Sequence, residues 1–381
     1  MKGTGLPAQA HNGEMRMQQV DVETLQEWLT GGRPVTVLDI RTAEDRAQWF
    51  IPGSIHVNAY DQLKAGDPQA LKSVDLPKDR PVVTICNVGK VSQIAAERLH
   101  ASGLEASSLA GGMKAWSLAW NTAETELEKA TVLQVRRTGK GCLSYIVGSA
   151  SEAVVIDASV EPEVYLRLAA ERGWTIRHVV DTHVHADHLS RSRALAKRVS
   201  ATLLLPTQNR VAFAFTPVKD GQAIEFGRSR ITVISTPGHT MESACYYLDG
   251  QALFTGDTLF TAGVGRPDLH ATRDETRKRA RVLYRSLQRL LELPADTLVL
   301  PGHSSEPPAF DRKPIAARLG QVSTKIAGWL RSEDDFLAAI LDRIPPTPPN
   351  YLRIVELNEA GTMPEGDASE LEAGANRCAV S

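Results

Sequence analysis

The sequence predicts an α/β protein built from two domains. The chain has 381 residues, a length that fits two domains or one large one. Short apolar runs typical of buried strands alternate with the 3.6-residue apolar spacing of helices. A polar, glutamate-rich stretch at 121–129 divides the chain, and we expect it to be a linker between a domain over 18–120 and a second domain over 130–358.

The composition and the chain ends exclude several classes of protein. Lys and Arg number 43 against 45 Asp and Glu, a net charge of −2, so no chain-wide basic field attracts nucleic acid or membrane. The polar segment 1–17 is predicted to be flexible, and the acidic, Gly- and Ala-rich segment 359–381 to be a disordered tail. Neither an apolar signal core nor a span of about 20 apolar residues occurs. The four scattered cysteines fit a reducing compartment, so we expect a cytoplasmic protein with no nucleic-acid or membrane partner; a homodimer is left open.

The first domain is predicted to contain a small parallel sheet. Buried β-type runs at 34–39 and 81–86 precede a stretch of helical spacing at 92–102, which Gly103 ends. Strands that alternate with helices in this way favour a parallel α/β arrangement.

The second domain is predicted to carry its chemistry where strands end. A histidine-rich segment or a Pro-Gly-His turn follows each of the predicted strands at 178–182, 231–235 and 297–300, the usual place for sites in sheet-based enzymes. The other predicted elements are strands at 142–148 and 153–159, a hairpin of 244–248 and 252–255 around Asp249-Gly250, helices at 162–172, 189–199, 274–293 and 335–342, and an extended segment at 344–349.

The strongest chemical signal is the segment 182–188, which reads Thr-His-Val-His-Ala-Asp-His. It is joined later in the chain by His239, Asp257 and His303. Three histidines and an aspartate after an apolar strand would be costly to bury without a cation. Imidazole combined with carboxylate suits iron or zinc, so the sequence predicts a divalent metal site.

These motifs resemble the metallo-β-lactamase superfamily. The resemblance rests on His-x-His-x-Asp-His at 183–188, Pro-Gly-His-Thr at 237–240, Phe-Thr-Gly-Asp-Thr-Leu-Phe at 254–260 and Pro-Gly-His at 301–303. It implies an αββα sandwich with the metal at one edge of the paired sheets. The predicted fold class is therefore α/β, with a small parallel-sheet domain followed by an αββα metallo-β-lactamase sandwich.

Two further segments resemble the persulfide dioxygenase branch of that superfamily. They are Gly-Val-Gly-Arg-Pro-Asp at 263–268 and the ending formed by 332–336 and 344–349. The resemblance implies one mononuclear Fe(II) per chain, held by His183, His239 and Asp257. Such a two-histidine, one-carboxylate triad leaves positions open for O2 and a substrate sulfur.

The neighbouring glyoxalase II branch is the alternative, with one or two zinc ions. It would add His185 to the first metal and use Asp187, His188 and His303, with Asp257 bridging, for a second. All of these residues are present, so the ligand set alone does not exclude a dinuclear hydrolase. In either branch Arg266 is a candidate to pair with a glutathione carboxylate, because its guanidinium offers planar bidentate hydrogen bonds.

The first domain resembles a single rhodanese domain. Asp-Ile-Arg at 39–41, Ile-Pro-Gly-Ser-Ile-His at 51–56 and Leu-Ala-Gly-Gly-Met-Lys-Ala-Trp at 109–116 flank Cys86 at that family's spacing. The resemblance implies that Cys86 takes up sulfane sulfur as a persulfide. Val91 stands where the family commonly has an arginine, and Lys90 is a candidate to replace that charge. The loop that would cradle the persulfide comprises Asn87, Val88, Gly89, Lys90, Val91 and Ser92.

The leading functional hypothesis joins the two resemblances. Glutathione persulfide or a related small persulfide would be oxidised by O2 to sulfite, and the rhodanese domain would load or consume persulfide and form thiosulfate from sulfite, in sulfide and persulfide metabolism. The alternative is a zinc-dependent hydroxyacylglutathione hydrolase with a sulfur-binding module. A third reading makes the rhodanese domain a noncatalytic sulfur sensor. Cys142, Cys245 and Cys378 are expected to have no role in chemistry.

Overall fold

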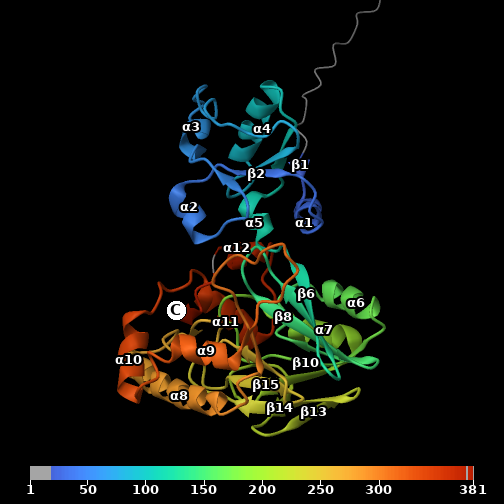
Figure 1. Cartoon of the computed structure of the whole chain (residues 1–381), viewed down its shortest axis with the longest axis vertical. Helices are drawn as coiled ribbons and strands as arrows, with labels where there is room; N and C mark the ends of the chain where they lie inside the picture. The colour runs from blue at the N-terminus through green and yellow to red at the C-terminus, as the bar shows by residue number, and fades with distance from the viewer. Residues whose placement is uncertain (1–18, 375, 381) are drawn as a thin grey trace, which may run out of the picture.

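The N-terminal domain of the computed structural model contains a five-stranded parallel sheet (Figure 1). The structure describes residues 19–374 and 376–380, so the flexible segment predicted over 1–17 lies outside the described residues. The strand order is β1-β5-β4-β2-β3, and every neighbouring pair is parallel. The strands are β1 (Gln19–Val20), β2 (Thr36–Asp39), β3 (Ile55–His56), β4 (Val82–Ile85) and β5 (Ala106–Leu109); the helices are α1 (Val22–Thr30), α2 (Ala43–Gln48), α3 (Tyr60–Lys64), α4 (Val91–Ala101) and α5 (Gly112–Trp116).

The central strand β4 is buried on both faces, as its apolar run predicts. Val82, Val83 and Ile85 are each fully buried. Ala95 and Ala96 of α4 pack in the same apolar cluster as Val82, and their small side chains let the helix lie close to the sheet. This arrangement places the segment after β4, which begins with Cys86, at the carboxyl edge of the sheet.

The C-terminal domain is a sandwich of two sheets with helices on both outer faces. The seven-stranded sheet has the order β12-β11-β10-β9-β8-β7-β6, and the six-stranded sheet has the order β13-β14-β15-β16-β18-β19. The first sheet contains β6 (Asn121–Glu126), β7 (Thr131–Arg136), β8 (Leu143–Ser149), β9 (Glu152–Ile156), β10 (Thr175–Val180), β11 (Thr202–Pro206) and β12 (Thr216–Val218). The second contains β13 (Ala223–Phe226), β14 (Ser229–Ser235), β15 (Ala244–Leu248), β16 (Ala252–Gly256), β18 (Leu298–Pro301) and β19 (Ala317–Arg318).

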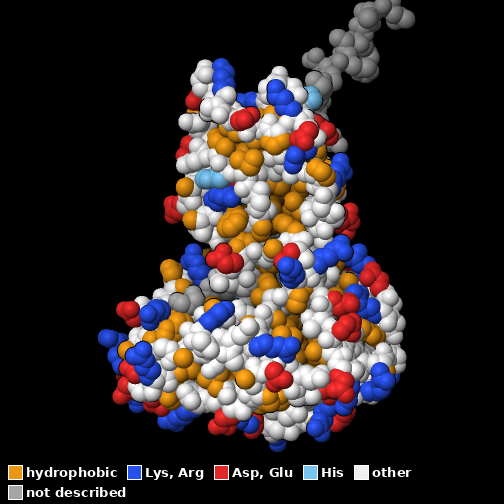
Figure 2. All heavy atoms as spheres, viewed as in Figure 1, with side chains coloured by type: hydrophobic (Ala, Val, Ile, Leu, Met, Phe, Trp, Pro, Cys, Tyr) orange, Lys and Arg blue, Asp and Glu red, His pale blue; other side chains and the backbone are white. Residues whose placement is uncertain are grey.

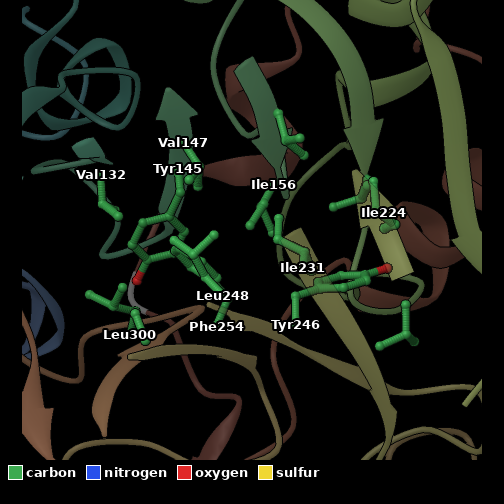
Figure 3. Packing of buried hydrophobic residues seen from close by; sticks show 14 of the residues in the cluster. Val132, Tyr145, Val147, Ile156, Ile224, Ile231, Tyr246, Leu248, Phe254 and Leu300 are labelled. Atoms are coloured by element: carbon green, nitrogen blue, oxygen red, sulfur yellow. The ribbon is translucent and has the colours of Figure 1, made fainter. Parts of the chain in front are cut away.

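An apolar layer between the two sheets forms the main core (Figure 3). Tyr145 of β8 and Phe254 of β16 meet edge to face across this layer, with ring centroids 4.9 Å apart. The helices α6 (Pro162–Ala170) and α7 (Ser192–Val199) cover the seven-stranded sheet, and α8 (Arg273–Leu291), α9 (Leu319–Ile326) and α10 (Glu333–Asp342) cover the six-stranded sheet. The predicted αββα sandwich is thus confirmed.

The predicted hairpin at 244–255 is also confirmed, and its turn explains its sequence. Asp249 and Gly250 have φ angles of 46° and 73°, and the amide of Gln251 donates to the carbonyl of Leu248 over 2.8 Å. Two consecutive left-handed residues define a type I′ turn, whose twist matches that of paired strands.

The linker predicted over 121–129 is wrong in its first part, because Asn121–Glu126 forms strand β6. This strand pairs antiparallel with β7 at the edge of the seven-stranded sheet. Asn121 and Ala123 point inward, while Glu124 and Glu126 are exposed. An edge strand tolerates charged residues on its open side, so its composition resembles that of a linker.

The disordered tail predicted over 359–381 is also wrong in the part that the structure describes. Helix α11 (Tyr351–Ala360) is followed by α12 (Ser369–Glu372) and by β20 (Ala379–Val380), which pairs antiparallel with β17 (Val264–Gly265). We call residues 367–374 and 376–380 the C-terminal strap. Glu372 anchors the strap, since its fully buried carboxylate pairs with two buried arginines described below.

The two domains meet beside the strap. Figure 2 shows the narrower N-terminal domain seated on the wider C-terminal domain, and α5 lies next to α12 at the junction (Figure 1). Within the described residues, no helix combines the length and the hydropathy needed to cross a bilayer.

Candidate metal centre and sulfur-transfer loop

The predicted metal ligands lie together at one edge of the sandwich. The segment 182–188 follows β10, His239 follows β14, Asp257 follows β16 and His303 follows β18. All of these side chains are buried. Strands from both sheets thus deliver their terminal residues to a single site.

His183, His239 and Asp257 form one compact group. The Nε2 atoms of His183 and His239 lie 3.9 and 3.6 Å from the Oδ2 atom of Asp257. In the described part of the chain, His183 Nε2 and Asp257 Oδ2 are buried without any hydrogen-bond partner. Because unpartnered buried polar atoms are costly, the three residues fit a divalent cation placed between them.

Hydrogen bonds behind the two histidines fix their orientation. The hydroxyl of Thr182 donates to Oδ2 of Asp157 (2.9 Å), so its oxygen is left to accept from Nδ1 of His183 (2.9 Å). Nδ1 of His239 donates to the carbonyl oxygen of Arg266 over 2.8 Å. With the proton on Nδ1, each Nε2 presents a lone pair to the centre of the group.

Electrostatics give this group the charge states that metal ligands need. Burial lowers the pKa of His183 well below its ordinary value and also lowers that of His239, so both imidazoles are neutral at pH 7. Burial alone would raise the pKa of Asp257, but the neighbouring His303 and the other histidines hold it below its ordinary value. Two neutral donors therefore face one carboxylate.

Asp187, His188 and His303 form a second group together with Cys142. Nδ1 of His303 lies 2.5 Å from Oδ1 of Asp257, and its Nε2 lies 2.7 Å from Oδ2 of Asp187. Nδ1 of His188 lies 3.1 Å from Oδ1 of Asp187. Burial opposes protonation, yet Asp187 raises the pKa of His188 to about 10 and raises that of His303 well above its ordinary value. Both histidines are thus in contact with carboxylates, which favour their protonated forms.

His185 belongs to neither group. Its Nε2 lies 3.2 Å from Oδ1 of Asp157, and it clusters with Asp157 and Asp181. The structure therefore brings His183 to the compact group without His185, although both come from the same motif.

Sequence reasoning missed Cys142 and Asn376. The thiol of Cys142 donates to Oδ2 of Asp187 over 3.2 Å, and the amide of Asn376 donates to the same oxygen over 2.8 Å. Burial and Asp187 raise the pKa of Cys142, but His188 and His303 outweigh them and lower it to about 7. Nothing in the sequence around either residue resembles a ligand motif, so only the fold reveals them.

Arg266 is placed near the metal group, but its side chain points elsewhere. It is buried, and its Nε and Nη2 atoms form a bidentate pair with Asp268 at 2.8 and 2.7 Å. Its Nη1 atom donates to the carbonyl oxygens of Pro346 and Arg377. Because Asp268 already occupies the guanidinium group of Arg266, the arrangement favours a role for Arg266 in holding the C-terminal strap rather than the predicted pairing with glutathione.

Cys86 lies at the base of its predicted loop. Its Sγ atom is 3.2 Å from the hydroxyl oxygen of Ser92 and accepts from the Ser92 amide over 3.4 Å. The loop is tightly backed, because a Cβ atom on Gly112 would lie 2.3 Å from the Cys86 carbonyl oxygen. Val91 is buried in the apolar cluster beside α4, while Lys90 is exposed. The other loop residues are Asn87, Val88 and Gly89.

Family models match both parts of the chain. Residues 137–303 match the metallo-beta-lactamase superfamily, and residues 21–119 match the rhodanese-like domain. The curated relatives include the hydroxyacylglutathione hydrolase of Brucella anthropi, which is 37% identical over 157 residues, covering 40% of this chain and 54% of that protein. A second, from Rhizobium johnstonii, is 36% identical over 151 residues, covering 39% and 56%. The chain thus spans about half the length of these curated relatives.

Solved structures give a longer match. ETHE1 from Myxococcus xanthus is 31% identical with a TM-score of 0.54, covering 61% of this chain and 99% of that protein. A metallo-beta-lactamase from Staphylococcus aureus is 25% identical with a TM-score of 0.55, covering 63% and 75%. The chain therefore belongs to the metallo-β-lactamase superfamily, and the parallel-sheet domain that precedes its sandwich is a rhodanese-like domain.

Proposed function

We propose that the chain is a persulfide dioxygenase coupled to a sulfurtransferase. The dioxygenase would oxidise glutathione persulfide at one Fe(II) held by His183, His239 and Asp257, and Cys86 would carry sulfane sulfur. The observation that carries the proposal is the contrast between the two histidine groups. Among the described residues, Nε2 of His183 and Oδ2 of Asp257 in the first group have no partner; in the second, Nε2 of His188 is also unpartnered, but His303 lies between the carboxylates of Asp187 and Asp257, and Asn376 donates to Asp187.

The contacts of His303 and Asp187 in the second group support a single metal ion. Both nitrogens of His303 lie against carboxylate oxygens, Nδ1 against Asp257 and Nε2 against Asp187. Asp187 is further engaged by Cys142 and by Asn376 of the strap. Filling a second metal position would require these ion pairs and hydrogen bonds to separate.

The reaction consumes water as well as oxygen. Glutathione persulfide, O2 and H2O give glutathione, sulfite and two protons, with four electrons passing from the outer sulfur to O2. When bound, Fe(II) would supply open positions for dioxygen and for the substrate sulfur. The protein's part is to orient His183 and His239 through Thr182 and the Arg266 carbonyl, to keep both imidazoles neutral by burial, and to keep Asp257 ionised.

A cavity beside the triad suits the rest of the substrate. It has a volume of about 520 Å³, and His183 and His185 form part of its lining. Arg193 and Lys197 also line it and would attract the carboxylates of a glutathione derivative, while Phe213 adds an apolar wall.

A zinc-dependent hydroxyacylglutathione hydrolase is the second candidate. It is favoured by the curated relatives and by the presence of Asp187, His188 and His303, the residues that the glyoxalase II pattern uses for a second metal ion. In that case zinc held by these residues would supply Lewis-acid activation of water for cleavage of a thioester.

The decisive experiment compares iron-loaded and zinc-loaded protein. Oxygen uptake with glutathione persulfide, matched one to one by sulfite, is expected with iron and not with zinc. His183→Ala should abolish it, whereas His100→Ala, at an exposed position on α4, should not. Zinc-supported cleavage of S-lactoylglutathione without oxygen uptake would instead establish the hydrolase.

A further inference from the structure

We infer that Ser108, on strand β5 and outside the loop that follows β4, is a positioning residue for sulfur transfer by Cys86. Its hydroxyl group orients the hydroxyl group of Ser92, so that Ser92 donates a hydrogen bond to the Cys86 sulfur. The inference rests on the proposed sulfurtransferase function and adds to it a residue from the neighbouring strand.

Three side chains form a continuous line of hydrogen bonds that ends at the sulfur, and we call this line the hydroxyl relay. The Oγ atoms of Ser108 and Ser92 lie 2.8 Å apart, and Oγ of Ser92 lies 3.2 Å from Sγ of Cys86. Ser92 also donates its backbone amide to the sulfur over 3.4 Å. All three residues are fully buried, so bulk water does not compete for these hydrogen bonds.

Two neighbouring strands hold Ser92 from the same side of the sheet. Strands β4 and β5 are parallel, and Thr84 pairs with Ser108 in their register, so the two side chains point to the same face. The hydroxyl of Thr84 donates to the backbone carbonyl of Ser92 over 2.7 Å. One strand thus fixes the backbone of Ser92, and the next strand contacts its hydroxyl group.

The direction of the hydrogen bonds follows from counting donors and acceptors. Among the residues that the structure describes, Ser92 is the only hydrogen-bond partner of the Ser108 hydroxyl. If Ser92 donated to Ser108, the proton of Ser108 would be buried without an acceptor, which is costly. Ser108 therefore donates to Ser92, and the hydroxyl proton of Ser92 points at the Cys86 sulfur.

The relay gives the sulfur two hydrogen bonds from one residue, the amide and the hydroxyl of Ser92. Such an arrangement suits a sulfur atom that carries no proton, either a thiolate or the inner sulfur of a persulfide. The neighbouring Val91 side chain is buried in an apolar cluster and brings no charge to the loop. The two hydrogen bonds from Ser92 therefore supply more of the stabilisation of a negatively charged sulfur than they would beside an arginine.

The relay acts when the Cys86 sulfur becomes the leaving group. A nucleophilic acceptor attacks the outer sulfur of the Cys86 persulfide and forms a new bond to it, and the electron pair of the breaking sulfur–sulfur bond goes to Sγ of Cys86. With cyanide as acceptor the product is thiocyanate, and no external oxidant or reductant is required. Negative charge thus develops at the atom to which Ser92 donates, and donors already fixed in place lower the barrier.

A double-mutant cycle between Ser108 and Ser92 tests the relay. With the full chain preloaded with sulfur from thiosulfate, we expect Ser108→Ala to slow single-turnover transfer to cyanide by about threefold to tenfold, and Ser92→Ala by about tenfold to a hundredfold. The double variant should match Ser92→Ala within about twofold, because Ser108 acts only through Ser92. Ser107→Ala, which removes a hydroxyl from the opposite face of the same strand, is the control and should retain the wild-type rate.

Alkylation of Cys86 keeps the inference apart from the transferase activity, because iodoacetamide reacts with a thiolate whether or not the protein transfers sulfur. Its rate, measured by mass spectrometry of the peptide that contains Cys86, should fall about threefold to tenfold in Ser108→Ala. Ser108→Thr keeps the hydroxyl and should restore most of the rate. This pattern would support the relay even if the wild-type protein transferred no sulfur.

Three results would overturn the relay. The first is an equal loss in Ser107→Ala and Ser108→Ala, which would mean that any lost hydroxyl on β5 has the same effect. The second is a double variant in which the two single losses multiply, since Ser108 would then act independently of Ser92. The third is a Ser108→Thr variant that is as slow as Ser108→Ala at unchanged thermal stability.

Discussion

Thr182 shows how a residue with no chemistry of its own prepares the metal group. Its amide and its hydroxyl both donate to Asp157, over 2.7 and 2.9 Å, and its carbonyl accepts from the amide of Ala244 over 2.9 Å. These bonds fix the oxygen that accepts from Nδ1 of His183. The orientation of the His183 imidazole is thus set by Thr182, the residue that precedes it in the chain.

Thr182→Val should therefore weaken metal binding while preserving side-chain volume. It leaves Nδ1 of His183 and Oδ2 of Asp157 without their hydroxyl partner. Loss of such a partner costs about 10- to 100-fold in metal affinity. Competition with a chelator at fixed iron measures this change. Thr182→Ser retains the hydroxyl and is the control; equal iron retention in Thr182→Val and wild type would show that this bond does not orient the ligand.

Residue-level prediction from sequence worked where residues share a motif and failed where partners come from distant segments. The histidines of 183–188 are grouped by the sequence itself, and the structure places them in one buried region. Glu372 lies 181 residues from Arg191, and nothing local to an acidic, Gly-rich segment indicates that its carboxylate is buried. The same holds for Asn376 and Cys142, which meet at Asp187.

Glu372→Gln should destabilise the protein and remove a pH dependence. Burial alone would raise the Glu372 pKa, but Arg137 and Arg191 lower it from 4.5 to about 2. This shift corresponds to about 3 kcal/mol of stability, present above pH 4.5 and lost as the pH falls from 4.5 toward 2. We expect Glu372→Gln to cost about 3 to 5 kcal/mol near neutral pH, because it leaves buried guanidinium groups poorly paired.

Urea unfolding at a series of pH values measures this difference. The gap between wild type and Glu372→Gln should narrow below pH 4.5. Glu370→Gln, at an exposed neighbouring position, should change stability by less than about 0.5 kcal/mol. A gap that stays constant between pH 7 and pH 3 would contradict the assigned ion pairs.

At the scale of elements, helix α8 positions the turn that carries His239. Ser286 donates through its hydroxyl to the carbonyl of Pro237 over 2.7 Å. Gly238 has a φ of 141°, and a Cβ atom placed on it would lie 2.4 Å from Cβ of Leu283. The helix thus lies directly against the backbone that precedes the ligand.

Gly238→Ala should displace the turn and reduce metal occupancy several-fold, with a stability loss of about 1 to 3 kcal/mol from overpacking. Gly221→Ala is the control that separates backbone strain from a steric clash. The φ of Gly221 is 74°, so an added methyl strains the backbone, but nothing lies within 4 Å of that methyl. It should cost only about 1 kcal/mol and leave metal occupancy intact. Metal analysis after dialysis, combined with thermal unfolding, checks both variants. Equal metal loss in the two would assign the effect to strain rather than to the contact with α8.

Elements with strong periodicity or clear turn chemistry could be predicted, whereas short elements that depend on partners could not. The basic helix predicted at 274–293 is α8, and the capping box of Thr272 and Glu275 explains its start. Strands β6 and β20 lack an apolar run that would predict them from sequence. Their backbones are instead held extended by pairing with β7 and β17. Such edge pairing is visible only once the neighbouring strand is in place.

At the scale of the whole molecule, the segment 137–141 docks the two domains. The indole of Trp49 donates to the carbonyl of Thr138 over 3.1 Å, and Nη2 of Arg137 donates to the carbonyl of Ser117 over 2.8 Å. The segment leads directly to Cys142, so the interface and the metal region are continuous along the chain. The interface therefore continues into the second histidine group through Cys142, whereas the ligands of the triad come from other segments of the sandwich.

Gly139→Ala should loosen this interface. A Cβ atom there would lie 1.8 Å from the carbonyl oxygen of Trp116, which a rigid backbone cannot accommodate. We expect a larger radius of gyration by small-angle X-ray scattering and faster proteolysis between the domains. Iron retention by the triad should stay close to wild type, because its ligands come from the sandwich alone. Gly328→Ala, where the added methyl meets nothing within 4 Å, is the matched control. If Gly139→Ala scatters like wild type, then the domains are not held together at this segment, and the contact between Lys114 and the strap carries the interface instead.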